Sequence, residues 1–263
     1  MGTYVVTGGT KGIGEQCVRF LREQNHEVIN IDIDGGDITA DLGTKPGREK
    51  AILSVYAQCP AGLDGLVSNA GIAGLPQFLP SYVLSVNYFG AVKLMEGLYP
   101  LLRRKKGNCA VTVSGSIIYF KRGKYTMDNL LVNCDDENRI CRFADTLDNK
   151  TVGNTMYVST KLALVRWVRR NAPSWAAHGV NLNAVAPGAV ETTIMGDTKS
   201  TKPDAVLMAL PMPTVYSGET MMAPRDIGHA LAFMVLPGAK GISGALLYCD
   251  GGTETLLYPD KIY

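Results

Sequence analysis

Two side chains in the second half of the chain could carry out proton transfer, because Tyr157 and Lys161 stand four positions apart. At this spacing two residues share one face of a helix, where an ammonium group close to a phenol favours the phenolate. A phenol, with an ordinary pKa of about 10, needs such help to exchange a proton near neutral pH. The pair therefore indicates acid/base chemistry, although taken alone it also fits two surface residues of a helix.

A second group of residues could bind phosphate. Gly8, Gly12 and Gly14 follow an apolar run at 3–7 and precede a helix-like segment. Glycines let the chain turn tightly and approach a pyrophosphate closely, while the first N–H groups of the helix attract an anion. A glycine-rich loop alone is weak evidence, but its place between the first strand and the first helix predicts dinucleotide binding.

Asp32, near the end of the second apolar run at 27–33, bears on which dinucleotide is bound. A carboxylate at this point accepts hydrogen bonds from ribose hydroxyls and repels a 2′-phosphate, which favours NAD over NADP. Lys11 argues the other way, because a cation in the turn could pair with a phosphate. We expect Asp32 to determine the cofactor preference and Lys11 to face solvent. NAD is therefore the predicted cofactor, and NADP is the alternative.

The apolar pattern supplies the scaffold that these residues need. Strand-like apolar runs alternate with helix-like segments along the chain. The strands are expected at 3–7, 27–33, 63–68, 109–114, 180–185 and 244–249, and the main helices at 12–24, 44–58, 79–103, 154–177 and 225–236. This alternation predicts an α/β fold, in which helices cover both faces of a doubly wound, Rossmann-type parallel sheet.

Length and composition exclude several classes of protein. The chain has 263 residues, 46% of them hydrophobic, with no internal repeat and no Gly/Ser linker, so we expect one domain spanning 1–263. A net charge of +2 gives no reason to expect a nucleic acid or an anionic membrane as partner. No apolar run approaches the roughly 18 residues of a membrane span, and a strand-like run at 3–7 leaves no room for a signal peptide. We therefore expect a cytoplasmic protein.

The cysteines and histidines do not predict a metal site. Six cysteines are scattered without a CxxC pair, and the three histidines are far apart in the sequence. Ligand clusters normally show short spacings, so no bound metal is expected. Reduced, mostly buried thiols are the better interpretation.

Two segments interrupt the alternation of strands and helices. Residues 119–153 are polar and separate a strand from the next helix by far more than the roughly 2–6 residues of a usual βα loop. This length predicts an insertion before the helix of Tyr157. Residues 189–224 hold five of the ten methionines. Methionine adapts to irregular apolar surfaces, so this segment fits either a contact with an apolar substrate or gap-filling beneath a long loop.

A series of motifs in a fixed order extends through almost the whole chain. In chain order they are the GxxxGxG turn at 8–14, Asp41-Leu42, Ser68-Asn69-Ala70-Gly71, Asn87, Ser114-Gly115-Ser116, Tyr157 and Lys161 as YxxxK, Asn183, Pro187-Gly188 with Thr192, and Asp250-Gly251-Gly252. Together these motifs resemble the short-chain dehydrogenase/reductase family. Ser68 departs from the family pattern, because it stands in place of the first Asn of an NNAG motif.

The resemblance implies a role for each motif. Tyr157 would be the acid/base, Lys161 would also hold the ribose of the nicotinamide half, and Asn87 would anchor a water molecule. Ser116 is the preferred serine for holding the substrate oxygen, and Ser114 is the alternative. The expected cofactor-binding residues are Gly8, Thr10, Lys11, Gly12, Ile13, Gly14, Asp32, Asp41, Leu42, Asn69, Ala70, Gly71, Tyr157, Lys161, Pro187, Gly188, Val190 and Thr192.

Within that family the sequence is most similar to the bacterial 3α-hydroxysteroid dehydrogenase/carbonyl reductase subgroup, on the stretches 31–34, 40–44 and 85–90 and the insertion at 119–153. The resemblance implies an NAD-dependent exchange between a secondary alcohol and a ketone on a hydroxysteroid or bile acid. It also implies a substrate lid at 189–224 and a homodimer, with a tetramer as the alternative. Two other functions stay open: reduction of a small ketone, quinone or sugar, and dinucleotide sensing without turnover.

Overall fold

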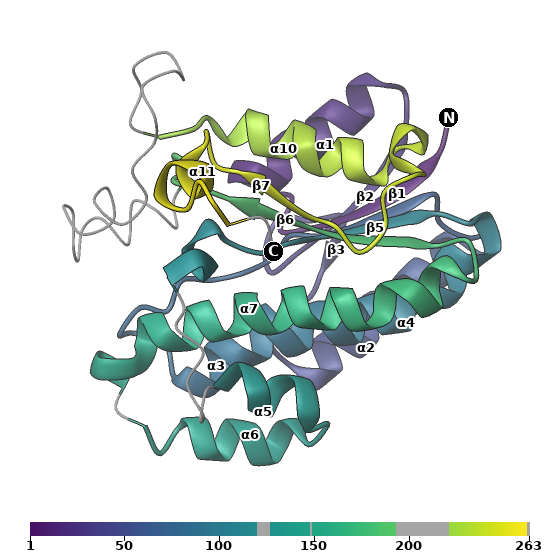
Figure 1. Ribbon diagram of the computed structural model, residues 1–263. Coiled ribbons are helices and arrows are strands. Elements are labelled where there is room, and N and C mark those ends of the chain that lie inside the picture. The colour runs from purple at the N-terminus through teal and green to yellow at the C-terminus, as the bar shows by residue number, and fades with distance from the viewer. Residues whose placement is uncertain (120–126, 148, 193–220, 262–263) are drawn as a thin grey trace.

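A seven-stranded parallel sheet forms the centre of the protein (Figure 1). The computed structural model describes residues 1–119, 127–147, 149–192 and 221–261. The strands stand side by side in the order β3-β2-β1-β4-β5-β6-β7, and every neighbouring pair is parallel. Their bounds are β1 Thr3–Thr7, β2 Glu27–Asp32, β3 Ile38–Thr39, β4 Gly65–Ser68, β5 Asn108–Thr112, β6 Asn181–Pro187 and β7 Leu246–Cys249.

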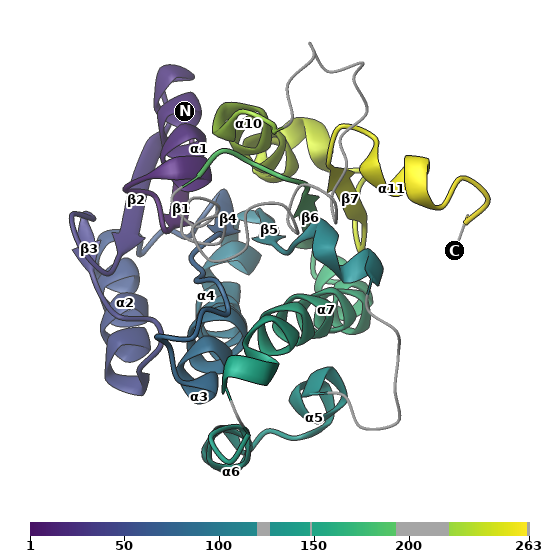
Figure 2. The ribbon, with the colours of Figure 1, turned by 90° about the vertical axis from the view of Figure 1, so that its left-hand side faces the viewer.

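Helices cover both faces of the sheet. The helices that flank it are α1 (Gly12–Glu23), α2 (Lys45–Gln58), α4 (Ala91–Lys105), α7 (Asn149–Ala176) and α10 (Pro224–Val235). Figure 2 shows α1 and α10 on one side of the strands, and α2, α4 and α7 on the other. Side chains alternate along a strand, so Val5 of β1 belongs to one apolar core while Tyr4 and Val6 belong to the other. The predicted doubly wound α/β fold is thereby confirmed.

The structure adds two features to the predicted elements. A seventh strand, β3, has two residues, which is too short for an apolar pattern to indicate. The predicted helix at 79–103 is present as three consecutive parts: α3 (Pro80–Leu84), a wide π-helical turn at Ser85–Gly90 and α4. The wide turn contains Asn87, and all six of its residues are buried.

The segment predicted as an insertion contains helices. A 3₁₀ turn at Gly115–Tyr119 follows β5, and then come α5 (Met127–Asn133) and α6 (Glu137–Ala144). Both helices lie on the side of α7 away from the sheet (Figures 1 and 2). Asp128 of α5 is buried and forms an ion pair with Arg166 of α7. Because a buried charge is costly without a partner, this ion pair fixes α5 against α7.

The segment predicted as a lid lies mostly outside the described residues, which break off after Thr192 and resume at 221. At its two ends Val190 and Met222 form a parallel β-bridge, and both side chains are buried. Short segments complete the fold: a 3₁₀ turn at Pro237–Ala239, and α11 at Thr253–Leu257. In the described part of the chain, no helix has the length and apolar character needed to cross a membrane.

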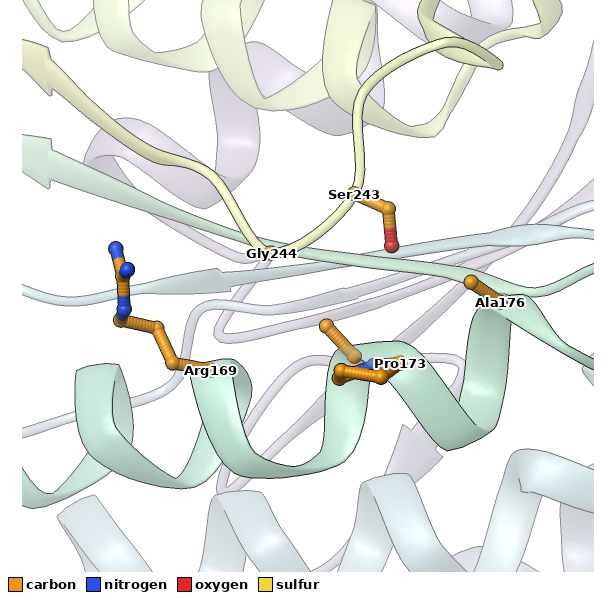
Figure 3. Close-up of a pocket in the computed structure, with 6 residues that line it drawn as sticks. Arg169, Pro173, Ala176, Ser243 and Gly244 are labelled. Carbon is orange, nitrogen blue, oxygen red and sulfur yellow. The ribbon is translucent and has the colours of Figure 1, made fainter.

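A shallow hollow of about 300 Å³ lies between α7 and the connection from β6 to β7 (Figure 3). Ser243 extends from that connection towards the helix, above Pro173 and Ala176. Gly244 has a φ of +74°, and a Cβ there would lie 3.3 Å from the Cβ of Ala172. The hollow is lined by none of the predicted site residues, so it does not belong to the candidate active site.

Candidate active site

The glycine turn between β1 and α1 uses backbone conformations that favour glycine. Gly8 and Gly12 have φ of +66° and +62°, in the left-handed region that favours glycine. A Cβ on Gly14 would lie 2.0 Å from the carbonyl oxygen of Gly8, so the helix can approach the turn only without a side chain there. Among the described residues, a Cβ on Gly12 would meet only Thr192, at 3.6 Å. The turn is therefore closed on its inner side and open at Gly12.

The N-terminus of α1 faces this turn without a capping side chain. Lys11 occupies the N-cap position in extended conformation and is exposed to solvent, and its side chain forms no capping hydrogen bond. Helix α2 differs, because the Thr44 hydroxyl accepts a hydrogen bond from the Gly47 N–H, at 3.1 Å. N–H groups at an uncapped helix N-terminus, together with the helix dipole, suit an anion such as a pyrophosphate.

Asp32, at the end of β2, is held beside the glycine turn. One carboxylate oxygen accepts a hydrogen bond from the Thr10 N–H at 3.0 Å, and the other accepts one from the Ile33 N–H at 2.7 Å. Thr10 also donates from its hydroxyl to the Asp34 carbonyl, at 3.0 Å. These bonds fix the carboxylate at the position where it can accept further hydrogen bonds from a ribose.

The Asp41-Leu42 step follows β3. Asp41 accepts hydrogen bonds on the same carboxylate oxygen from the Gly43 N–H at 2.8 Å and from the Tyr82 hydroxyl at 3.4 Å. Burial and the nearby carboxylate raise the pKa of Tyr82, which keeps the phenol in its donating form. Leu42 is buried, and its carbonyl accepts a hydrogen bond from Arg48 at 3.2 Å.

Asn69 ties the ends of three strands together. Its amide nitrogen donates to the Thr7 and Gly8 carbonyls at 3.2 and 3.3 Å, and its amide oxygen accepts from the Thr112 hydroxyl at 3.0 Å. The Thr7 hydroxyl in turn accepts hydrogen bonds from the N–H groups of Asn69 and Ala70, each at 2.9 Å. The glycine turn after β1 is thus fixed to the ends of β4 and β5.

Asn87 of the wide helical turn is held by a reciprocal pair of hydrogen bonds. Its amide oxygen accepts from the Ile72 N–H and its amide nitrogen donates to the Ile72 carbonyl, both at 2.8 Å. A Cβ on the adjacent Gly71 would lie 3.1 Å from the Asn87 amide oxygen and 3.4 Å from the Lys161 Nζ atom. The structure therefore brings Gly71, Asn87 and Lys161 together.

Lys161 is a buried cation on α7. Its Nζ atom donates a hydrogen bond to the carbonyl oxygen of Thr112, at 3.0 Å. Burial lowers the pKa of the ammonium to about 8, because the charged form loses its hydration. The Nζ atom lies 5.7 Å from the centre of the Tyr157 ring, so the two side chains share one face of the helix as their spacing predicts.

Tyr157 is hydrogen-bonded to Ser114, one of two neighbouring serines. Burial raises the pKa of its phenol above the ordinary value, and a hydrogen bond with Ser114 opposes that rise. Burial, and not the nearby ammonium, therefore sets the direction of the shift in this structure. The Ser114 and Ser116 hydroxyl oxygens are 2.9 Å apart, and the Ser116 N–H also donates to the Ser114 hydroxyl at 3.2 Å. Ser114 therefore contacts Tyr157, and Ser116 contacts Ser114.

The turn after β6 closes the site against the glycine turn. Gly188 donates its N–H to the Cys249 carbonyl at 3.0 Å, and a Cβ on it would lie 2.8 Å from the Asp250 Cα atom. Val190 is buried in the core beneath α1 and α10. The Thr192 side chain approaches Gly12, so the segment 187–192 lies next to the expected phosphate position.

Several residues that hold this site carry no sequence signal of their own. Thr112 contributes a carbonyl to Lys161 and a hydroxyl to Asn69, and Thr7 contributes a hydroxyl to two N–H groups. Asp250, by contrast, belongs to one of the sequence motifs; it accepts hydrogen bonds from the N–H groups of Gly252 and Glu254, and so holds the start of α11. A polar residue at the end of a buried parallel strand is the one pattern that could have indicated Thr7 and Thr112.

Comparisons with known proteins agree with this geometry. Residues 146–254 match the family model described as enoyl-(acyl carrier protein) reductase. The chain is 31% identical, over 99% of its length and 100% of the relative, to 3-alpha-hydroxysteroid dehydrogenase/carbonyl reductase of Comamonas testosteroni. It is 28% identical to coniferyl-alcohol dehydrogenase of Pseudomonas sp. strain HR199, over 94% of each chain.

A solved structure is similar over the same length. The crystal structure of the 3-alpha-hydroxysteroid dehydrogenase of Pseudomonas sp. B-0831, complexed with NADH, has a TM-score of 0.89 and 32% identity, with 99% of this chain and 100% of that chain covered. This chain therefore belongs to the short-chain dehydrogenase/reductase family of oxidoreductases.

Proposed function

We propose that the protein interconverts a secondary alcohol and a ketone by hydride transfer, with NAD as cofactor. The observation that carries the proposal is that Tyr157 and Lys161 of α7 lie beside Ser114 and Thr112, where β5 ends. Asn69 links this strand end to the glycine turn after β1. When bound, the nicotinamide supplies the hydride acceptor or donor. The residues of this chain supply binding, orientation and the proton.

The cofactor fits the described residues. The uncapped N-terminus of α1 and the open Gly12 suit the pyrophosphate, and the fixed carboxylate of Asp32 suits the ribose hydroxyls of the adenosine half. A 2′-phosphate would meet that carboxylate, so NAD is preferred over NADP. An ammonium has three N–H donors, so Lys161 can keep its bond to Thr112 and also hold the nicotinamide ribose.

Tyr157 exchanges the proton. In alcohol oxidation its phenolate accepts the hydroxyl proton of the substrate, and in ketone reduction its phenol donates that proton to the carbonyl oxygen. A raised phenol pKa makes the protonated form dominant near neutral pH, which suits donation. The positive charge of an oxidised nicotinamide and of Lys161 opposes this rise and favours the phenolate needed for oxidation.

We assign Ser114 the task of holding the substrate oxygen, in place of Ser116, which the sequence motifs favoured. Ser114 makes the hydrogen bond with Tyr157, so a substrate oxygen that contacts the phenol also lies near this hydroxyl. Ser116 hydrogen-bonds to Ser114 at 2.9 Å and orients it. Two donors aimed at one oxygen align it for transfer and stabilise the charge that develops there.

A hydroxysteroid or bile acid is the substrate class that we favour. Both the relative from Comamonas testosteroni and the similar crystal structure carry a 3-alpha-hydroxysteroid dehydrogenase name. Ile118, two residues after Ser116, forms an apolar cluster with Ala189, and Met221, Tyr248 and Tyr258 pack against it. An apolar surface of this kind suits the ring system of a steroid. The coniferyl-alcohol dehydrogenase among the relatives supports a smaller alcohol or carbonyl compound as the second candidate.

A spectrophotometric survey tests both candidates. Purified protein is mixed with NAD or NADP and with 3-, 7-, 12- and 17-hydroxysteroids, bile acids or small secondary alcohols, and the nicotinamide absorbance is followed. We expect turnover of one hydroxysteroid position with NAD. Turnover of small alcohols alone would overturn the steroid assignment, and tight NAD binding without any turnover would overturn the enzymatic one.

We also propose a homodimer. Strand β7 is an edge of the sheet, and apolar side chains are exposed on it and on two helices that follow or precede it: Leu247, Phe233 and Leu256 are 37%, 47% and 55% exposed. An edge strand with exposed apolar neighbours is a favourable surface for a second copy of the chain. Light scattering after gel filtration tests the proposal, and a monomer or tetramer would contradict it.

A further inference from the structure

Helix α6, in the segment between β5 and α7, is joined to the Asp41-Leu42 step through Arg48. The Glu137 carboxylate at the start of α6 forms an ion pair with the Arg48 guanidinium, with 2.6 Å between Oε2 and Nη2. The Arg48 side chain is 5% exposed, and its Nη1 atom donates to the Leu42 carbonyl at 3.2 Å. One buried guanidinium therefore bridges α6 and the backbone at residue 42.

A second link leads from the other end of α6 to the same step. The Asp145 carboxylate accepts a hydrogen bond from the N–H of Ser81 in α3, at 2.9 Å. The next residue, Tyr82, donates from its hydroxyl to the Asp41 carboxylate, at 3.4 Å. The two ends of α6 are thus connected, by separate routes, to two adjacent residues that stand at the adenosine end of the proposed cofactor site.

Helix α6 is joined to the Asp41-Leu42 step by hydrogen bonds and an ion pair, because it does not pack tightly against α2. A cavity of about 680 Å³ separates the two helices and α3, and it is lined by Gly43, Lys45, Arg48, Leu79, Ser81, Tyr82, Ser85, Asp135, Asp136, Glu137, Asn138, Cys141, Arg142 and Asp145. The Ser85 hydroxyl also donates to the second carboxylate oxygen of Glu137, at 3.4 Å. Across this cavity, the ion pair of Glu137 with Arg48 can hold α6 in place, because charge-assisted hydrogen bonds are strong and directional.

We infer that α6 positions the adenosine half of the cofactor, with Glu137 and Arg48 as positioning residues. The inference rests on the proposed function, since it concerns the same cofactor site. If Glu137 loses its charge, the buried guanidinium loses its counter-ion and is driven to turn towards water. Its hydrogen bond to the Leu42 carbonyl is then lost, and the Asp41-Leu42 step is released on one side.

Binding of cofactor fragments to Glu137→Gln tests the inference. Dissociation constants are measured for NADH, for ADP-ribose, which is the adenosine half with its pyrophosphate and ribose, and for reduced nicotinamide mononucleotide. We expect NADH and ADP-ribose to bind about tenfold more weakly, as loss of one charged hydrogen bond implies. The mononucleotide should bind unchanged, which a general loosening of the fold would not produce.

Asp128→Asn is the matched control, because Asp128 forms the other buried ion pair of this segment, with Arg166 on α7. It should lower the melting temperature while leaving all three dissociation constants unchanged. Unchanged NADH and ADP-ribose binding in a folded Glu137→Gln protein would overturn the inference. The inference would also be overturned if Glu137→Gln weakened the binding of all three ligands equally. The same holds if Asp128→Asn weakened binding as much as Glu137→Gln. A wild-type protein that binds no dinucleotide would instead overturn the proposed function itself.

Asp145→Asn keeps the inference testable if Glu137→Gln does not fold. Asp145 is exposed, so its replacement carries little cost to folding, and it weakens the hydrogen bond from the Ser81 N–H. We expect NADH and ADP-ribose to bind a few-fold more weakly, again with unchanged mononucleotide binding. A folded Asp145→Asn protein with wild-type affinity for all three ligands would contradict the second route from α6.

Discussion

The Nζ atom of Lys161 donates a hydrogen bond to the carbonyl oxygen of Thr112, so a cation of α7 is anchored on the last residue of β5. The same threonine donates from its hydroxyl to Asn69, which holds the glycine turn. One residue at a strand end thus connects the glycine turn with the buried lysine of α7. This bond keeps the lysine buried, and burial is what lowers its pKa to about 8.

The first prediction concerns stability and pH in Lys161→Met. The pKa of Lys161 is lowered from 10.5 to about 8 in the folded protein, so folding favours the neutral amine. The contribution of Lys161 to the free energy of unfolding is fully present above pH 10.5. It is lost as the pH falls through the range from 10.5 to about 8. At pH 7 the charged, buried lysine therefore costs about 3 kcal/mol relative to high pH, at about 1.4 kcal/mol per pH unit.

Methionine has no proton to lose, so the comparison isolates the lysine. We expect Lys161→Met to be more stable than the wild type at pH 7 and the difference to shrink as the pH rises from 8 to 10. Urea unfolding at several pH values measures it. A stability difference that does not change with pH would show that Lys161 has an ordinary pKa.

The second prediction concerns proton transfer by Tyr157. Tyr157→Phe removes the phenol hydroxyl and keeps the ring, so the rate should fall by roughly 10²–10⁴-fold or more, the share of a general acid/base. NADH affinity should change little, since the ring packing is retained. Stopped-flow or steady-state rates, with NADH titration by fluorescence as the control, measure both. A variant that retains full activity would remove Tyr157 from the proposed mechanism.

The third prediction separates the two serines. Ser114→Ala removes the hydroxyl that reaches Tyr157 and should lower kcat by about 10²–10³-fold, the value of one donor to a developing oxyanion. Ser116→Ala removes a hydroxyl that contacts Ser114, so it should cost about tenfold or less. Parallel kinetics of the two variants decide the assignment. The reverse order would restore Ser116, which the sequence motifs favoured.

The fourth prediction concerns cofactor choice. Asp32→Ala removes the carboxylate that would repel a 2′-phosphate, so the ratio of kcat/KM for NAD to that for NADP should fall. Lys11→Ala is the matched variant, because Lys11 is the exposed cation of the same turn. We expect little change in the ratio with Lys11→Ala. If the ratio moved only in Lys11→Ala, Lys11 and not Asp32 would select the cofactor.

The fifth prediction concerns the contact between α1 and the glycine turn. Alanine is normally a better helix residue than glycine by about 1 kcal/mol. In Gly14→Ala, however, the new Cβ would lie 2.0 Å from the Gly8 carbonyl oxygen, so the turn must move and NADH binding should be lost. Gly241→Ala is the control, because no atom of the residues that the structure describes lies within 4 Å of a Cβ there. Wild-type NADH affinity in Gly14→Ala would contradict the described packing.

The alternation of apolar and amphipathic segments was enough to predict the doubly wound sheet, because each buried parallel strand needs a continuous apolar run. It could not indicate β3, which has two residues, or the wide turn at Ser85–Gly90, whose apolar residues fit an ordinary helix equally well. The position of residues 119–153 indicated an insertion, but not that its helices α5 and α6 would lie against α7 and α3. Those contacts depend on polar links between residues far apart in the sequence, such as the ion pair of Asp128 with Arg166 and the hydrogen bond from the Ser81 N–H to Asp145.

Within the site, the motifs named candidate side chains but not the groups that hold them in place. Gly71 approaches both Asn87 and Lys161, and these three residues belong to three different motifs of the sequence. The carbonyl of Thr112 and the backbone of Ile72 are hydrogen-bond partners that any residue type could supply, so no sequence pattern marks them. The choice between two neighbouring serines likewise depends on how the chain bends after β5, which the sequence does not specify.

The wide turn at Ser85–Gly90 has a consequence for the comparison of related sequences. A π-helical turn contains one residue more than the α-helical turn it replaces. Deleting one residue there would leave a continuous helix but rotate Asn87 by about 100° relative to α4, away from Ile72. A one-residue gap opposite 85–90 in an otherwise well-aligned relative would therefore mark the loss of this asparagine's anchor, even where an asparagine is still present.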